Sequence, residues 1–271
     1  HRAGDGARAH IPGGDITMCD TCGCGIVDSY AVDGVPTSSG APTDSEHSHD
    51  GDQDHRHVHI HASLLGKNDR IAERNRGHLM EKGVAAINMV SSPGAGKTAL
   101  IERTLRDAVD TMKAGVIVGD LATDNDAKRL SATQAPVVQI TTGTVCHLDA
   151  DMVAHAMPRL DLDALDLLII ENVGNLVCPA GYDLGEDARV VLMSVTEGED
   201  KPAKYPTMFR TADVVVITKV DMAEPARFDR EAALNCIHRV APDAAVIELS
   251  AVTGEGMEAW HEYLAQRLHR R

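Results

Sequence analysis

The sequence predicts an α/β fold in which a doubly wound, mostly parallel sheet is covered by helices. From residue 84 onward, short apolar runs typical of buried strands alternate with segments that have the spacing of amphipathic helices. Such alternation implies parallel strands joined by right-handed crossovers. Aromatic residues make up only 3% of the chain, so aliphatic side chains must build the core, as in sheets buried on both faces.

Each element has its own evidence along the chain. A helix is expected at 63–82, where four apolar residues lie roughly on one face, namely Leu64, Leu65, Ile71 and Leu79. Further helices are expected at 97–110, 125–132, 148–157, 203–210, 224–240 and 256–269. Short apolar runs predict strands at 84–90, 116–120, 137–141, 166–171, 189–195, 213–218 and 245–249. We therefore expect one domain at residues 63–271.

The first part of the chain, residues 1–62, differs in composition. It is rich in Gly, Asp, Ser and His and shows almost no apolar periodicity, so we expect it to be disordered without metal. Residues 1–17 contain no hydrophobic signal-peptide core. Because Met18 directly precedes a cysteine cluster, it is a candidate natural start, with residues 1–17 as an upstream extension.

The bulk composition excludes some classes of function. A formal net charge of −15 argues against general nucleic-acid binding, which needs a positive surface. No apolar run approaches the roughly 18 residues that a membrane-spanning helix needs, so no membrane insertion is expected. Three of the six cysteines are crowded between residues 19 and 24, which is poor spacing for disulfides and good spacing for a metal. These features predict a reducing, cytoplasmic location.

The stretch from Ser91 to Thr98 has the pattern of a phosphate-binding loop between a strand and a helix. Small residues let backbone N–H groups close around phosphates, and the helix N-terminus adds partial positive charge. Lys97 is expected to reach the β- and γ-phosphates, and the Thr98 hydroxyl to bind Mg²⁺. The pattern usually begins with Gly, where this chain has Ser91. The candidate nucleotide-binding residues are Gly94, Ala95, Gly96, Lys97 and Thr98.

Carboxylates follow two strands that we expect beside this loop. Asp120 ends one strand and is followed by Asp126, and Glu171 ends the other. Ligands of open α/β sheets bind at the carboxyl ends of the strands, and a carboxylate there suits a Mg²⁺ site on a phosphate-loop enzyme. Position at a strand end does not decide whether Asp120 or Asp126 is the Mg²⁺ ligand.

Two later segments indicate which base is bound. The strand at 213–218 leads into Thr218-Lys219-Val220-Asp221, which is similar to the Asn-Lys-x-Asp pattern that reads guanine through its Asp carboxylate. Here Thr218 replaces the Asn, while Lys219 and the discriminating Asp221 remain. Ser250 and Ala251 follow the last expected strand and resemble the loop that covers the base from its other side. Because both segments follow a phosphate-binding loop in the order expected of GTP-binding proteins, they favour GTP over ATP.

The N-terminal region carries two metal-binding patterns. Cys19, Cys22 and Cys24 offer three thiolates, which bind Ni²⁺, Zn²⁺ or Cu⁺. Three sulfurs leave a fourth position open, which suits a site that loads and unloads metal. The following tract of histidines suits storage or buffering of Ni²⁺, Zn²⁺ or Cu²⁺, and it contains His47, His49, His55, His57, His59 and His61.

Soft ligands also occur inside the expected domain. Cys146 and His147 follow one predicted strand, and Cys178 follows another. Both strands are expected to end near the nucleotide, so these ligands would lie close to the loops that respond to it. Cys236 lies within an expected helix and is interpreted as a small buried hydrophobic residue.

The longest motifs together resemble the HypB family, the hydrogenase nickel-incorporation GTPases of the SIMIBI class. The resemblance covers essentially all of residues 18–271. Its motifs are Met-Cys-x-x-Cys-Gly-Cys at 18–24, Ser-Pro-Gly-Ala-Gly-Lys-Thr at 92–98, Cys-His-Leu-Asp-Ala at 146–150 and Glu-Asn-Val-Gly-Asn-Leu-Val-Cys-Pro-Ala at 171–180.

The resemblance implies a GTPase that delivers Ni²⁺ to the large subunit of [NiFe] hydrogenase, together with a HypA-type accessory protein. It implies a second metal site at Cys146, His147 and Cys178, located at a nucleotide-dependent homodimer interface. It also implies Mg²⁺ contacts from Thr98, Asp126 and Glu171, and so prefers Asp126 to Asp120. With Lys97, these three are the candidate catalytic residues.

Three alternatives remain beside this interpretation. A urease-type nickel GTPase shares the fold and a His-rich N-terminus but lacks the Cys-x-x-Cys-Gly-Cys start and the Cys-His signature. A nickel or zinc storage protein would use residues 18–62 as its functional part. An ATP-dependent kinase is disfavoured by Lys219 and Asp221. The sequence leaves open whether Ni²⁺ or Zn²⁺ occupies each metal site, and it reveals no catalytic base for hydrolysis.

Overall fold

The fold is known from a computed structural model that describes residues 30–37 and 53–269, with side chains from residue 65 onward in the second range. The expectations for Cys19, Cys22 and Cys24 therefore lie outside the described residues, as do those for the histidine side chains at 47–61. In the described part, none of the helices has the length and apolar character needed to cross a membrane.

The sheet is mostly parallel, as the sequence predicts. Its strand order is β2-β1-β5-β4-β6-β3-β7-β8-β9, and β3 through β9 run parallel to one another. The seven parallel strands are β3 (Ala85–Ser91), β4 (Ala114–Asp120), β5 (Val137–Thr141), β6 (Leu167–Glu171), β7 (Ala188–Ser194), β8 (Val214–Thr218) and β9 (Ala245–Leu249). All seven lie within two residues of the strands predicted from sequence.

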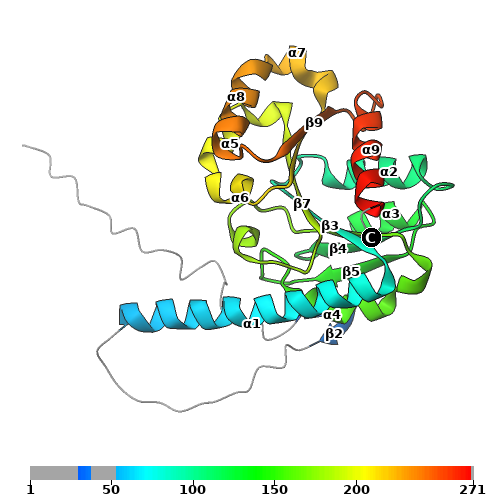
Figure 1. Ribbon diagram of the computed structural model, residues 1–271, viewed down its shortest axis with the longest axis vertical. Helices are drawn as coiled ribbons and strands as arrows, with labels where there is room; N and C mark the ends of the chain where they lie inside the picture. Colours follow the sequence, from blue (N-terminus) through cyan, green and yellow to red (C-terminus); the bar gives the residue numbers. More distant parts are fainter. Residues whose placement is uncertain (1–29, 38–52, 270–271) are drawn as a thin grey trace, which may run out of the picture.

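Helices cover both faces of this sheet, so the fold is doubly wound (Figure 1). They are α1 (Gln53–Lys82), α2 (Lys97–Asp107), α3 (Asn125–Ser131), α4 (Ala150–Ala156), α5 (Lys201–Lys204), α6 (Pro206–Arg210), α7 (Ala223–Ala226), α8 (Arg230–Val240) and α9 (Met257–Leu268). On one face α2, α3 and α9 bury Leu100, Leu130 and Trp260 against the strands. On the other, α1 and α4 lie over one half of the sheet, and α6 and α8 over the other half.

Two of the predicted helices are each divided in two. The segment 224–240 breaks at Arg227, whose φ of 53° is left-handed, and Asp229 starts α8 by accepting a hydrogen bond from the Ala232 N–H. The segment 203–210 divides before Pro206, which begins α6 because it lacks an N–H to continue the preceding helix. Pro206 was therefore a signal for a break that the sequence already contained, whereas the left-handed backbone at Arg227 was not.

A short hairpin extends the sheet where we expected no packed structure. Its strands are β1 (Tyr30–Val32) and β2 (Val35–Thr37), and β1 pairs antiparallel with β5. Tyr30 and Val32 are buried, and Asp33 and Gly34 both have positive φ, as a two-residue turn requires. The prediction of disorder throughout 1–62 is therefore wrong for residues 30–37, and for the start of α1 at Gln53. Three-residue strands are too short for periodicity to detect, although the Asp-Gly pair was a usable signal.

Candidate nucleotide and metal site

The phosphate-binding loop connects β3 to α2 as predicted. Its backbone turns back on itself at Gly94 and Gly96, which have φ values of 75° and 100°. These angles are left-handed, so a residue with a Cβ would be strained at either position. Gly96 directly precedes Lys97, the first residue of α2, so the N–H groups of the first helical turn point out of the loop, where an anion can accept from them.

Lys97 is buried beneath the loop, and its ammonium group donates a hydrogen bond of 3.0 Å to Ser91 Oγ. Burial lowers the pKa of Lys97, while the nearby carboxylates of Glu171 and Asp126 act in the opposite direction. Ser91, which departs from the usual Gly, thus supplies the hydrogen-bond acceptor for this lysine. An ammonium held there in low dielectric gains from any negatively charged ligand that enters the cleft.

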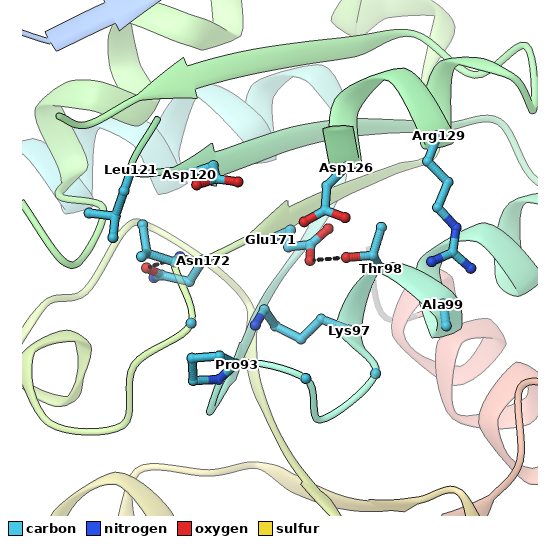
Figure 2. Close-up of a pocket in the computed structure, with 15 residues that line it drawn as sticks. Pro93, Lys97, Thr98, Ala99, Asp120, Leu121, Asp126, Arg129, Glu171 and Asn172 are labelled. Carbon is cyan, nitrogen blue, oxygen red and sulfur yellow. Dashed lines mark hydrogen bonds between the residues drawn. The ribbon is translucent and has the colours of Figure 1, made fainter. Parts of the chain in front are cut away.

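Glu171 lies at the end of β6 and faces the first turn of α2 (Figure 2). Its Oε1 accepts a hydrogen bond of 2.7 Å from Thr98 Oγ1, whereas its buried Oε2 has no partner in the described part of the chain. Burial raises the pKa of Glu171 to about 7, against the opposing charge of Lys97. A buried carboxylate oxygen without a partner, beside a hydroxyl, is a donor set that suits a hard cation such as Mg²⁺.

Both aspartates that follow β4 line this cleft, but their environments differ, and the structure agrees with the preference for Asp126 that the family resemblance implied. Asp120 already accepts two hydrogen bonds from its own turn, from the Thr123 hydroxyl at 2.7 Å and the Ala122 N–H at 3.3 Å. Asp126 lies in the first turn of α3, and no hydrogen bond to its carboxylate is found among the described residues. Asp126 is therefore the more available ligand of the two.

These side chains surround an open cleft of about 500 Å³ at the carboxyl ends of β3, β4 and β6. Its walls combine the phosphate-binding loop, the start of α2, the β4–α3 connection and the segment after β6. The lining residues are Pro93, Gly94, Gly96, Lys97, Thr98, Ala99, Gly119, Asp120, Leu121, Asp126, Arg129, Glu171, Asn172, Val173 and Gly174. The volume and the paired charges suit a phosphorylated ligand with a divalent cation.

The segment predicted to read the base lies directly beside the phosphate-binding loop. Thr218 is buried and donates a hydrogen bond of 2.6 Å to the Ala95 carbonyl, and Lys219 Nζ donates one of 2.8 Å to the Gly94 carbonyl. Asp221 lies in the exposed turn that follows. Thr218, which stands in place of the usual Asn, thus supports the loop backbone, and the Asp221 carboxylate remains accessible.

The second base-contacting segment is also ordered, but its two candidate residues differ. Ser250 is buried, and its Oγ accepts hydrogen bonds from the Val252 and Thr253 N–H groups at 3.2 and 3.1 Å. Its hydroxyl therefore shapes the loop from inside. Ala251 is half-buried, and its carbonyl accepts a hydrogen bond of 3.3 Å from Arg103 on α2.

The three soft ligands of the domain come together. One ligand atom each from Cys146, His147 and Cys178 lies within 4.8 Å of the others, and the two sulfur atoms are 3.0 Å apart. Burial raises the pKa of Cys146 to about 11, with the Cys178 thiol as a further cause. Burial also lowers the pKa of His147 to about 4, so its imidazole is neutral at physiological pH and can bind a metal.

The environment of His147 fixes its ring. The imidazole packs against the Tyr182 ring at a centroid distance of 4.1 Å, and its buried Nδ1 lacks a hydrogen-bond partner in the described residues. A neutral imidazole beside two thiols is a donor set that suits Ni²⁺ or Zn²⁺. Cys236 is buried in α8, as expected of a hydrophobic role.

One segment, residues 171–178, links this soft-ligand cluster to the phosphate site. It begins at Glu171 and ends at Cys178. In between, Asn172 Oδ1 accepts a hydrogen bond of 3.1 Å from the Leu148 N–H, and Asn175 donates one of 3.2 Å to the Cys146 carbonyl. Gly174 lies against the phosphate-binding loop, so closely that an added Cβ would lie 3.0–3.1 Å from Pro93.

Sequence reasoning assigned no role to several residues that the structure brings to these sites. Asn172 and Asn175 were part of a motif, but their hydrogen bonds to the segment around Cys146 depend on tertiary structure. Tyr182 follows Cys178 closely, and nothing in the sequence placed its ring on His147. Arg129 lies one helical turn after Asp126, and this i, i+3 spacing is the signal that could have placed both on one face of α3.

Comparisons with known proteins agree with this arrangement. Residues 85–248 match the family model described as CobW/HypB/UreG, nucleotide-binding domain. The hydrogenase maturation factor HypB of Escherichia coli K12 is 50% identical over 201 residues, which cover 74% of this chain and 69% of that protein.

Two solved structures are also similar. HypB from Helicobacter pylori in complex with nickel has a TM-score of 0.72 and 40% identity, covering 75% of this chain and 96% of that one. The hydrogenase maturation factor HypB from Archaeoglobus fulgidus has a TM-score of 0.71 and 43% identity, covering 75% of this chain and 99% of that one. With its phosphate-binding loop, its parallel sheet and its Cys-His-Cys cluster, this chain belongs to the HypB family of P-loop GTPase-type nucleotide-binding proteins.

Proposed function

We propose that this protein is a GTP-hydrolysing nickel metallochaperone that delivers Ni²⁺ to the large subunit of [NiFe] hydrogenase during maturation. The observation that supports it most directly is the shared segment 171–178. A single stretch of eight residues carries a candidate Mg²⁺ ligand at one end and a candidate nickel ligand at the other. Any rearrangement of this segment on GTP binding or hydrolysis changes the geometry of the metal ligands.

In this proposal GTP binds in the cleft with its phosphates on the loop Gly94-Ala95-Gly96 and its terminal phosphates next to Lys97. Thr98, Asp126 and Glu171 hold Mg²⁺, which neutralises charge on the β- and γ-phosphates when it is bound. The unpartnered Oε2 of Glu171 and the available carboxylate of Asp126 support this choice of ligands. Asp221 reads guanine, Lys219 packs beside the loop, and the loop at Ser250 and Ala251 covers the base.

Nickel is the cargo of the second site. The thiols of Cys146 and Cys178 lose their protons as they bind the metal, so binding competes with protons and falls at low pH. Zn²⁺ prefers similar ligands and is the expected competitor. Cys19, Cys22 and Cys24 would form a separate site of three thiolates, and a HypA-type accessory protein would receive or supply the ion. We also propose a cytoplasmic location, where thiols stay reduced.

A GTP-dependent homodimer is the proposed assembly. Four of the exposed large apolar side chains follow the carboxyl ends of β4, β6, β8 and β9, and they are Leu121, Val177, Met222 and Val252. This edge of the sheet also carries the nucleotide cleft and the soft-ligand cluster. Three protein ligands leave a tetrahedral or square-planar ion one position short, which a second protomer can fill. Pairing through this edge would bury the apolar side chains.

The test is a titration of Ni²⁺ into the GDP-bound protein and into the protein bound to a non-hydrolysable GTP analogue. We expect the Ni²⁺ affinity and the dimer fraction to differ between the two states. Cys146→Ala should abolish the Ni²⁺ response while GTP-dependent dimerisation remains. Equal Ni²⁺ affinity in both states, with a dimer that ignores the nucleotide, would contradict the proposal. Transfer to a hydrogenase large subunit is then followed through its nickel content.

A further inference from the structure

The nucleotide cleft contains one basic side chain that the proposed phosphate and Mg²⁺ contacts leave unused. Among the described residues that line the cleft, Lys97 and Arg129 are basic, whereas Asp120, Asp126 and Glu171 are acidic. A bound nucleoside triphosphate adds several negative charges to this acidic group. Phosphoryl transfer depends on compensating charge at the terminal phosphate, so the position of the second cation matters.

Arg129 is well placed for that task. It lies on α3 three residues after Asp126, and residues at this spacing lie on the same face of a helix. Figure 2 shows its guanidinium group extending from α3 toward Thr98 and Ala99, at the N-terminal turn of α2. The terminal phosphate is expected between that turn and Asp126, within the reach of a long arginine side chain.

A carboxylate on α2 holds Arg129 in this structure. Its Nε is 2.5 Å from Glu102 Oε2, while the other oxygen of Glu102 is 2.5 Å from Arg106 on the next turn of α2. Glu102 is largely covered, with 13% of its side chain exposed, whereas 49% of the Arg129 side chain is exposed. If Arg129 leaves, Glu102 keeps Arg106 as its partner, so the movement strands no buried charge.

We propose that Arg129 moves from Glu102 to the terminal phosphate of bound GTP and acts as a catalytic arginine supplied by the same chain. This inference rests on the proposed GTPase function. In the reaction, the oxygen of a water molecule forms a bond to the γ-phosphorus. The bond to the β–γ bridging oxygen breaks, its electron pair passes to GDP, and a water proton leaves with inorganic phosphate or solvent. Arg129 donates hydrogen bonds to the γ-phosphoryl oxygens and forms no covalent bond.

The geometry also separates this role from that of Lys97. Lys97 is buried under the loop and is held by Ser91, so it contacts the phosphates in the ground state and in the transition state alike. Arg129 reaches the cleft from its outer side and must exchange one anionic partner for another. Its attraction to the phosphate is therefore expected to matter most when negative charge builds on the γ-phosphoryl and leaving-group oxygens.

The experiment compares Arg129→Gln with Arg106→Gln in single-turnover GTP hydrolysis. The two arginines share Glu102 as their carboxylate partner, but of the two only Arg129 lines the cleft. We expect Arg129→Gln to slow hydrolysis about 100-fold or more, as loss of a transition-state donor does. Arg106→Gln should hydrolyse GTP at the parent rate. Arg129→Lys should recover only a small part of the loss, because an ammonium cannot donate in bidentate fashion.

A binding measurement supplies a readout besides turnover. Affinity for GDP and for a non-hydrolysable GTP analogue should change by less than about fivefold in Arg129→Gln, because the loss falls on the transition state. Binding of GDP with aluminium fluoride, which mimics the transferring phosphoryl group, should be lost in Arg129→Gln and kept in Arg106→Gln. Thermal unfolding measures how much stability each variant loses with its ion pair to Glu102, and we expect the two losses to be similar.

Two results would overturn the inference. One is an equal hydrolysis rate in Arg129→Gln and in the parent. The other is an equal slowing in Arg129→Gln and Arg106→Gln, which would assign the effect to the ion pairs with Glu102. Failure of the proposed function is a different result, since a parent protein that does not hydrolyse GTP at all removes the reaction itself.

Discussion

The phosphate cleft and the soft-ligand cluster are built in opposite ways. The cleft holds ionisable groups of both signs, with Lys97 hydrogen-bonded to Ser91 and close to the carboxylates of Glu171 and Asp126. The cluster holds neutral groups in which burial favours the thiol of Cys146 and the uncharged ring of His147. The first is therefore prepared for a highly charged ligand, while the second must lose protons when a metal arrives.

The two regions also differ in how they come together. The phosphate-binding loop of the cleft comes from one continuous strand, loop and helix at 85–107, whereas the cluster depends on residues 146–147 and 178, which meet only in the folded domain. Segment 171–178 belongs to both. The difference teaches that the phosphate-binding loop could form locally, but communication with the metal requires the loops after β5 and β6 to be packed together.

Removing the buried positive charge of the cleft should have the largest effect on ligand binding. Lys97→Ala deletes the buried cation that faces the phosphates, so GTP affinity should fall on the order of 100-fold or more. Ni²⁺ affinity of the nucleotide-free protein should stay unchanged, because the Cys-His-Cys cluster does not contact Lys97. Isothermal titration with GTP and with Ni²⁺ measures both. Hydrolysis of GTP at the parent rate by Lys97→Ala would remove the assignment of the phosphate site.

Cutting the link between the two regions is the next test. Asn172→Ala removes the acceptor of the Leu148 N–H and leaves a buried donor unpaired, at a cost of about 1–3 kcal/mol in unfolding free energy. The difference in Ni²⁺ affinity between the GDP-bound and GTP-analogue-bound states should shrink in this variant.

Asn68→Ala is the matched control for that link. Asn68 is also buried, and its Oδ1 accepts the Ala150 N–H at the start of α4, two residues after Leu148, but it lies outside segment 171–178. It should lose similar stability while keeping the nucleotide dependence of Ni²⁺ binding. If the two variants alter this dependence equally, the coupling does not run through Asn172.

The pH dependence of stability sharpens the contrast in charge. The pKa of Glu171 is raised to about 7 in the folded protein, mainly by burial, so between pH 4.5 and pH 7 the folded state binds a proton that the unfolded chain has released. The stability contributed by this group therefore falls as pH rises through that window, by at most about 1.4 kcal/mol per pH unit.

Glu171→Gln should remove this contribution to the decrease of stability with rising pH. Urea unfolding of the metal- and nucleotide-free protein at several pH values measures it. A Glu171→Gln variant whose stability falls with pH as steeply as the parent's would show that Glu171 is already ionised in the folded state.

The smallest expected effect lies at the far edge of the sheet. Tyr30 on β1 makes a hydrogen bond of 2.7 Å with His155 Nδ1 on α4. Tyr30→Phe should lower the unfolding free energy by about 1 kcal/mol, because one hydrogen bond is lost and the ring stays in place. GTP and Ni²⁺ affinities should both be unchanged. A change in either affinity would mean that the β1–β2 hairpin also influences the two sites.

Much of the fold could be predicted because its signals are local. Strands β3 to β9 are mostly apolar runs, and each lies within two residues of its predicted position. The hairpin at 30–37 was missed because its strands are only three residues long and gain their burial from β5 and α4. The break between α7 and α8 was missed because it depends on a left-handed backbone at Arg227, a residue type that is common inside helices.

The sequence by itself determined the phosphate-binding loop, the candidate guanine-reading Asp221 and the identity of the soft ligands, since each depends on residue types at short spacing. The family resemblance implied a site at Cys146, His147 and Cys178 and preferred Asp126 to Asp120. The tertiary structure added that the three soft ligands meet, the hydrogen bonds that make Asp120 less available than Asp126, and the position of Arg129 in the cleft. These properties depend on which loop ends lie side by side at the carboxyl edge of the sheet. Strand order sets that arrangement, and strand order follows from the packing of the whole domain.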